Sequence, residues 1–169
     1  MAPESYEESL LEFLVSALYA RVGERGTMTG QGRNARFEIT KSLGGGSCAA
    51  DSGLDYALPS GRKVTHKADI LVTLPRGRRL TIDLIWASND PDPFKARAYD
   101  MLQLKNCLGP QIWAMMIYLR PGTGGISAEA VKEICYPFDL FFACEHQDPQ
   151  NPAIWVPILD RIEAEIAER

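Results

Sequence analysis

Histidine is scarce in this chain of 169 residues, since His66 and His146 are the only two. Neither has a second histidine at the spacing of a metal-ligand pair, so catalysis by a histidine base has little support, with an exception for His66 because of its charged neighbours. The four cysteines are far apart, with no CxxC pair and no neighbouring CxxH. The sequence therefore predicts neither a zinc site nor a thioredoxin-like redox pair, and we expect four reduced, mostly buried thiols.

Long apolar runs are also missing. No stretch approaches the roughly 20 residues needed to cross a bilayer, and the first residues lack the basic start and apolar stretch of a signal peptide. We therefore expect a cytoplasmic protein that does not enter a membrane. With 46% hydrophobic and 24% charged residues the composition is that of a globular protein. The length is that of about one domain, so we expect residues 1–169 to share one core.

Positive charge is in slight deficit, and the net charge of -4 argues against a protein that coats nucleic acid through bulk charge. Basic residues nevertheless gather in a glycine-rich stretch and in a turn between two apolar runs, where they could contact phosphates. A solvated surface with ordinary loop charges explains them equally well. The candidates for nucleic-acid binding in these two places are Arg33, Arg36, Arg76, Arg78 and Arg79.

Periodicity predicts an α/β protein with a mixed central sheet flanked by helices. Segment 43–61 contains Gly-Gly-Gly-Ser, Asp-Ser-Gly and Pro-Ser-Gly, so we interpret it as a long loop. The remaining chain alternates between helical and strand patterns in the order helix, three strands, helix, strand, helix, strand, helix. The expected helices cover residues 4–22, 92–107, 127–134 and 155–166, and the expected strands cover 35–41, 67–74, 80–87, 112–119 and 139–144.

Two carboxylates interrupt neighbouring apolar strands, Asp69 in Lys-Ala-Asp-Ile-Leu-Val and Asp83 in Leu-Thr-Ile-Asp-Leu-Ile-Trp. A carboxylate in such a strand is costly without a partner, and a bound cation is the simplest general explanation. On the first helix Glu7 falls on the apolar arc, whereas Glu8 points away. The alternative is that the aspartates pair with Lys67, with Arg79 or with an amide at a strand edge, and that Glu7 only favours the helix dipole.

The order of elements and the placement of the acids over residues 4–119 resemble the PD-(D/E)XK nuclease superfamily. There a leading helix carries an inward acid, the second strand carries an acid, and the third strand carries acid-x-Lys. The corresponding residues here are Glu7, Asp69 and Asp83-Leu84-Ile85, so the acids match and isoleucine stands in place of the lysine. The resemblance implies a restriction-endonuclease-like αβββαβ core, followed by a helix–strand–helix extension at the C-terminal end.

The resemblance also implies a metal site. Asp69, Asp83, the carbonyl of Leu84 and, directly or through water, Glu7 would bind Mg²⁺, and Mn²⁺ could replace it. Phosphodiester cleavage needs such a cation to screen the phosphate and to lower the pKa of the attacking water. Mg²⁺ suits a few carboxylates and several waters.

A cation from elsewhere could replace the missing lysine. Lys67 lies two residues from Asp69 and thus on the same face of its strand. On the helix over 92–107, Lys95, Tyr99 and Gln103 are spaced four apart and form one polar stripe, which is either an active-site wall that contacts nucleic acid or a half-exposed helix edge. We favour Lys95 over Lys67 as the catalytic substitute.

Two functions of different classes follow. The first is a divalent-metal-dependent nuclease that hydrolyses phosphodiester bonds, with DNA as the expected substrate. The second is a catalytically inactive nuclease-like domain that serves as a nucleic-acid-binding or assembly module, which isoleucine at position 85 favours. An acidic binding module without a nucleic-acid role is a third possibility. A nuclease of this size commonly works as a homodimer or within a larger complex, so we expect such an assembly.

Overall fold

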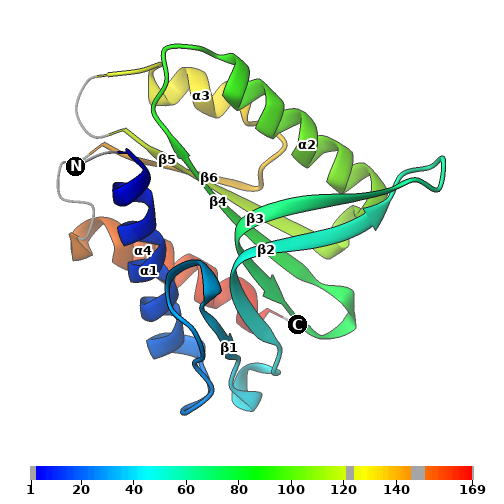
Figure 1. The fold of residues 1–169 in the computed structure, drawn as a ribbon, viewed down its shortest axis with the longest axis vertical. Coiled ribbons are helices and arrows are strands. Elements are labelled where there is room, and N and C mark those ends of the chain that lie inside the picture. The colour runs from blue at the N-terminus through cyan, green and yellow to red at the C-terminus, as the bar shows by residue number, and fades with distance from the viewer. Residues whose placement is uncertain (1–2, 121–123, 146–150, 169) are drawn as a thin grey trace.

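The computed structural model describes residues 3–120, 124–145 and 151–168, with side chains from Glu7 onward. In this part of the chain six strands form one sheet whose spatial order follows the chain. β1 to β4 pair antiparallel, and β4, β5 and β6 run parallel (Figure 1). The fold is therefore α/β with a mixed sheet, as periodicity predicts. The strands are β1 (Arg36–Glu38), β2 (Ser47–Ala57), β3 (Lys63–Thr73), β4 (Arg79–Trp86), β5 (Ile112–Leu119) and β6 (Leu140–Cys144).

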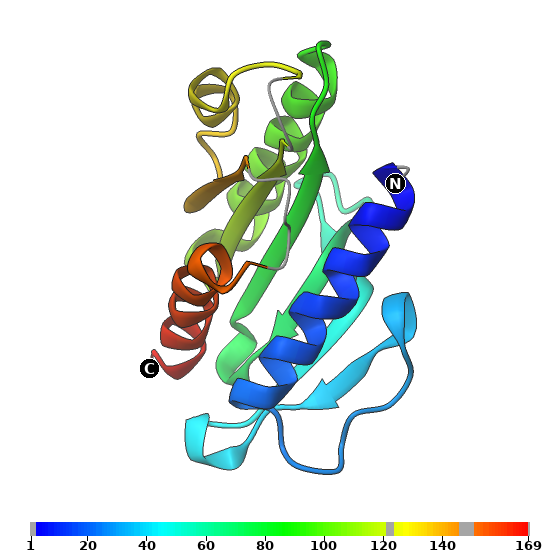
Figure 2. The same ribbon diagram turned by 90° about the vertical axis from the view of Figure 1, so that its left-hand side faces the viewer.

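Helices cover both faces of the sheet. α1 (Pro3–Val22) and α4 (Pro152–Ala167) lie together on one face, in front of the sheet in Figure 2, and α2 (Asp92–Leu108) and α3 (Ala128–Ile134) lie on the other. Each pair of helices closes its own apolar cluster against the sheet. We call these the α1/α4 cluster and the α2/α3 cluster.

The parallel half of the sheet follows from its connections. Parallel neighbours need a crossover, and α2 supplies it between β4 and β5. Because helices pack on both faces here, every residue of β5 except Trp113 is buried. This explains why the strand has no alternating pattern in the sequence.

The prediction of a long loop over 43–61 is wrong, because β2 occupies its centre. β2 pairs with β3 over nearly its whole length, from Ser47 opposite Thr73 to Ala57 opposite Lys63. Its apolar residues do alternate, at Cys48, Ala50, Leu54 and Tyr56, but glycine and serine between them obscure the pattern. Pairing with β3 overrides the low strand propensity of those residues. Four strands therefore precede α2, and Asp69 and Asp83 lie on the third and fourth strands of the chain, where we expected the second and third.

The other predicted elements are confirmed within a few residues, although β1 covers only the centre of the strand expected over 35–41. All four cysteines are thiols rather than disulfides, and Cys48, Cys135 and Cys144 are buried, as expected from the sequence. In the described segments no helix combines the length and the apolar character that crossing a bilayer would require.

Candidate functional site

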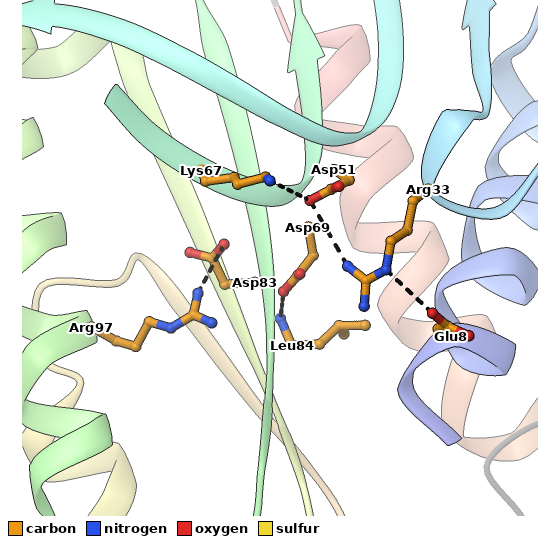
Figure 3. A network of polar contacts seen from close by, with 8 residues as sticks. All are labelled: Glu8, Arg33, Asp51, Lys67, Asp69, Asp83, Leu84 and Arg97. Atoms are coloured by element: carbon orange, nitrogen blue, oxygen red, sulfur yellow. Dashed lines mark hydrogen bonds and ion pairs between the residues drawn. The ribbon is translucent and has the colours of Figure 1, made fainter. Parts of the chain in front are cut away.

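The two strand carboxylates lie where β3 and β4 separate. The regular pairing of these strands runs from Thr73 opposite Arg79 to Ile70 opposite Ile82, and Asp69 and Asp83 are the next residue on each strand. Beyond that point a side chain replaces the backbone as the hydrogen-bond partner of β4. The Asp69 Oδ2 accepts a hydrogen bond of 2.7 Å from the backbone N–H of Leu84 (Figure 3). The structure thus brings the predicted pair to one gap in the sheet.

The Asp83 carboxylate is fully buried beneath α2. Its Oδ1 lies 3.7 Å from Arg97 Nη1 and its Oδ2 lies 3.4 Å from His66 Nε2, and its side chain has 0% exposure. Neither oxygen has a hydrogen-bond partner within the described residues, and His66 Nε2 has none either. A buried carboxylate without hydrogen bonds is unusual and costly, so this position calls for a further ligand or for closer approach of its two basic neighbours.

Asp69 is in a different environment. Burial raises the pKa of its carboxyl group, and the negative charge of Asp83 raises this pKa further. The hydrogen bond from Leu84 opposes this pKa rise, as do the positive charges of Arg97 and Arg33. The two carboxylates therefore act on each other electrostatically, but Figure 3 shows that they point differently, Asp83 toward α2 and Asp69 along the backbone of β4.

A local irregularity in β2 and β3 produces this arrangement. Asp51 on β2 has a φ of 45°, in the left-handed region that aspartate tolerates better than most residues. On β3 the neighbouring alternate residues Ala68 and Ile70 face different clusters, Ala68 the α2/α3 cluster and Ile70 the α1/α4 cluster. Both strands thus change face at the level of Asp51 and Asp69. This change lets Asp69 lie in the gap beside β4 and turns His66 toward Asp83.

The lysines expected to replace the motif lysine do not approach Asp83. Lys95 is exposed on α2, and Lys67 is 69% exposed and forms a 3.5 Å ion pair with Asp51. The cation that reaches Asp83 is Arg97, which sequence reasoning missed because it searched for lysine. The signal was available, because Arg97 lies three residues after Phe94 and four before Met101, which are both buried against the sheet.

Glu7 and Leu84 remain candidate ligands. Glu7 is half-buried on the side of α1 that faces the sheet, and Glu8 is exposed, as the helical periodicity predicts. The ion pair between α1 and the following turn comes from Glu8, whose Oε1 lies 3.5 Å from Arg33 Nε. Leu84 donates its N–H to Asp69 and packs its side chain in the α1/α4 cluster.

Most of the predicted nucleic-acid contacts lie away from the carboxylates. Arg78 donates to the carbonyls of Glu165, at 2.8 Å, and Glu168, so it ties the β3–β4 turn to the end of α4. That turn lies four residues along the strands from Asp69, about 13 Å at 3.3 Å per residue. Arg76 and Arg79 lie at the same turn, and Arg36 lies on the exposed side of β1. Two candidates lie on α2. Tyr99 is on its outer side, and the amide of Gln103 donates to Tyr56 Oη at 3.1 Å.

The donors at the gap fit one class of metal better than another. Three or more histidine, cysteine, aspartate or glutamate side chains do not gather into a metal-binding group anywhere in the described segments, and His146 lies outside them. A closed site of zinc type uses three or four such ligands. Two carboxylates and a backbone carbonyl fit Mg²⁺, which keeps several waters.

Compared with families of known proteins and with curated proteins, the chain matches none of them.

Proposed function

We propose that the chain is a divalent-metal-dependent nuclease that hydrolyses phosphodiester bonds, with DNA as the first substrate to test. The observation that carries the proposal is the Asp83 carboxylate, which is fully buried beside Asp69 in the gap between β3 and β4 and receives no hydrogen bond from the described residues. A protein has little reason to keep such a costly group unless the group has a ligand. Clusters of costly buried charge are typical of functional sites.

The arrangement of the elements supports the same proposal. α1, the antiparallel strands β2, β3 and β4, then α2 and β5 follow the order of an αβββαβ core, with Asp69 on its second strand and Asp83 on its third. β1 is then a three-residue addition at the edge of the sheet, and α3, β6 and α4 form the C-terminal extension. The restriction-endonuclease-like fold is part of this proposal.

The residues of the gap would divide the work as follows. Asp69, Asp83 and the carbonyl of Leu84 would hold Mg²⁺, with Glu7 as a further candidate. When bound, the ion supplies screening of the phosphate charge and a lowered pKa of the attacking water. Burial of Asp83 under α2 keeps bulk water away from its carboxylate, which strengthens every charge interaction made there.

Arg97 would replace the missing motif lysine. Ile85 lies two residues from Asp83 on β4, and both residues face the side of the sheet covered by α2. A lysine at position 85 would lie on the same side of the sheet as Asp83, the side from which Arg97 of α2 approaches. Arg97 is 36% exposed on its side chain, so its guanidinium can reach a phosphate as well as Asp83. His66 flanks the other oxygen of Asp83, with its Nε2 at 3.4 Å from Oδ2.

The alternative function has its own supporting observation. Asp83 already pairs with Arg97 at 3.7 Å and with the His66 imidazole at 3.4 Å, so the carboxylate has two basic neighbours. If the pairs tighten in solution they satisfy Asp83 without a metal, which would leave a nuclease-like domain that binds nucleic acid or assembles with a partner but does not cleave.

A cleavage assay separates the two functions. We expect the wild type to cut single-stranded, duplex or branched DNA, or RNA, in Mg²⁺ or Mn²⁺ and not in EDTA. Asp83→Ala should lower the rate about 10²-fold or more, because loss of a metal ligand removes several kcal/mol of transition-state stabilisation. Asp100→Ala, which removes an exposed carboxylate of α2, is the matched control and should retain the activity.

Two results would contradict the nuclease. One is the absence of metal-dependent cleavage on every substrate, and the other is equal activity of Asp83→Ala and wild type. In the first case, fluorescence anisotropy with the same oligonucleotides tests the alternative, since a binding module would still bind them.

A further inference from the structure

Arg33 flanks the carboxylate pair on the side opposite Arg97. Both guanidinium groups act electrostatically on the Asp69 carboxylate, and Figure 3 places them on its two sides. Arg97 comes from α2 on one face of the sheet. Arg33 comes from the short turn Gly32–Asn34, which packs between α1 and β2 on the other face. The gap in the sheet is therefore bordered by one arginine from each layer of helices.

Two carboxylates hold the Arg33 guanidinium. Its Nε lies 3.5 Å from Glu8 Oε1, and its Nη1 lies 3.9 Å from Asp51 Oδ1. Asp51 is itself fixed by its unusual backbone conformation and by the ion pair with Lys67. A guanidinium has five N–H donors, so these two contacts leave donors unused. The Arg33 side chain is 44% exposed, and within the described residues Nη2 forms no hydrogen bond or ion pair.

We propose that Arg33 binds a phosphate of the strand to be cut, on the α1 side of Asp69, and that Glu8 and Asp51 are positioning residues that hold its guanidinium for this contact. The proposal rests on the nuclease function proposed above. A planar fork of donors matches phosphate oxygens, and prior fixation of the side chain reduces the entropy lost on binding. With Arg97 on the other side, the strand would cross the gap between the two arginines.

The positioning role makes a prediction that simple charge does not. Glu8 and Asp51 are negative, so as bare charges they repel a nucleic acid, and removal of either would tighten binding. As holders of Arg33 they have the opposite effect, because a freed arginine side chain must be ordered again when substrate binds. The sign of the effect of neutralising Glu8 therefore distinguishes the two roles.

The test compares steady-state cleavage and oligonucleotide binding across variants of the full chain. Arg33→Gln should lower kcat/KM about 10- to 100-fold and reduce the slope of log K against log[salt] by about 0.7 to 0.9, the loss of one phosphate contact. Arg33→Lys should keep the salt slope but not the full rate, because it retains the charge without the fork. Binding is measured in Ca²⁺ with a labelled 20-nucleotide single strand and its duplex.

Glu8→Gln supplies the decisive comparison, with Glu12→Gln as its matched control. Glu12 lies one turn further along α1, is exposed, and forms no ion pair with Arg33. We expect Glu8→Gln to lower kcat/KM about fivefold with an unchanged salt slope, whereas Glu12→Gln leaves kcat/KM equal or slightly higher. Thermal melting checks that each variant is folded.

The outcomes separate this inference from the nuclease itself. If Asp83→Ala abolishes cleavage but Glu8→Gln behaves like Glu12→Gln, or Arg33→Gln keeps the wild-type salt slope, the role of Arg33 is wrong and the nuclease stands. If the wild type binds but does not cleave, the nuclease is wrong, and the salt slope of Arg33→Gln still decides whether Arg33 contacts phosphate. If the wild type neither binds nor cleaves, both are overturned.

Discussion

At the scale of single residues, the cost of removing a carboxylate from water organises the site. Asp69 recovers part of this cost through the N–H of Leu84, while Asp83 has two basic neighbours within the described residues and a hydrogen bond from neither. Both groups are therefore poised to gain from an additional positive charge, and each lowers protein stability as long as that charge is missing.

This cost appears as a pH dependence of folding at Asp69. Burial raises the pKa of the folded state above that of the unfolded chain, so the folded protein holds a proton at Asp69 more readily. Protonated Asp69 therefore contributes favourably to the free energy of unfolding below the pKa that its carboxyl group has in the unfolded chain. This contribution is lost as the pH rises through the raised pKa of the folded state. Asp69→Asn, which cannot ionise, should therefore gain in stability over the wild type as the pH rises from about 4 toward 7.

Urea denaturation at several pH values measures this difference in unfolding free energy. Asp100→Asn, an exposed change of the same kind on α2, should differ from the wild type by an amount that hardly varies with pH. A difference for Asp69→Asn that stays constant or shrinks with rising pH would refute the unfavourable ionisation of Asp69.

At the scale of elements, the sequence predicts those with a strong single pattern and misses those with a mixed one. α1 and α2 show helical spacing of apolar residues, and β5 is a continuous apolar run. The positions of these three elements follow from these patterns alone. β2 was missed because its strand character depends on its partner β3. The two aspartates stand out in the sequence because they interrupt apolar strands. Helical periodicity places Arg97 beside the buried face of α2, but its contact with Asp83, like that of His66, depends on packing and strand pairing that the local pattern does not encode.

The change of face in β2 can be tested at Asp51. Its φ of 45° suits glycine and asparagine but strains a β-branched residue. We expect Asp51→Gly and Asp51→Asn to unfold within about 1 kcal/mol of the wild type, since exposed ion pairs contribute little. Asp51→Val should lose about 2 kcal/mol, because the left-handed conformation is costly for valine.

Chemical denaturation of these variants gives the unfolding free energies, and Asp55→Val is the matched control. Asp55 is exposed on the same strand, has no positive φ, and among the described residues its side chain bonds to Thr65 alone. If Asp51→Val costs no more than Asp55→Val, the backbone at position 51 is not constrained as described, and the origin of the gap in the sheet must be sought elsewhere.

At the scale of the whole molecule, two layers of helices hold the sheet from both sides, and the carboxylates lie where the sheet between them opens. Stability and function then oppose each other, as they often do at sites built from costly groups. In the absence of metal, Asp83 should be a net burden on the fold, whereas a bound ion should turn the same residue into a source of stability.

Thermal melting of Asp83→Asn in EDTA and in Mn²⁺ tests both halves of this statement. In EDTA the variant should melt about 2–4 °C above the wild type, the shift expected for about 1 kcal/mol in a domain of this size. The Arg97 side chain is 36% exposed, so loss of the Asp83 charge leaves its guanidinium in contact with water. Mn²⁺ at about 100 times its Kd should stabilise the wild type by about 2.7 kcal/mol and leave Asp83→Asn unchanged.

Asp100→Asn should respond to Mn²⁺ as the wild type does. If Asp83→Asn instead melts lower in EDTA and Mn²⁺ stabilises neither protein, the pair of Asp83 with Arg97 is a structural contact, and the domain is the inactive module.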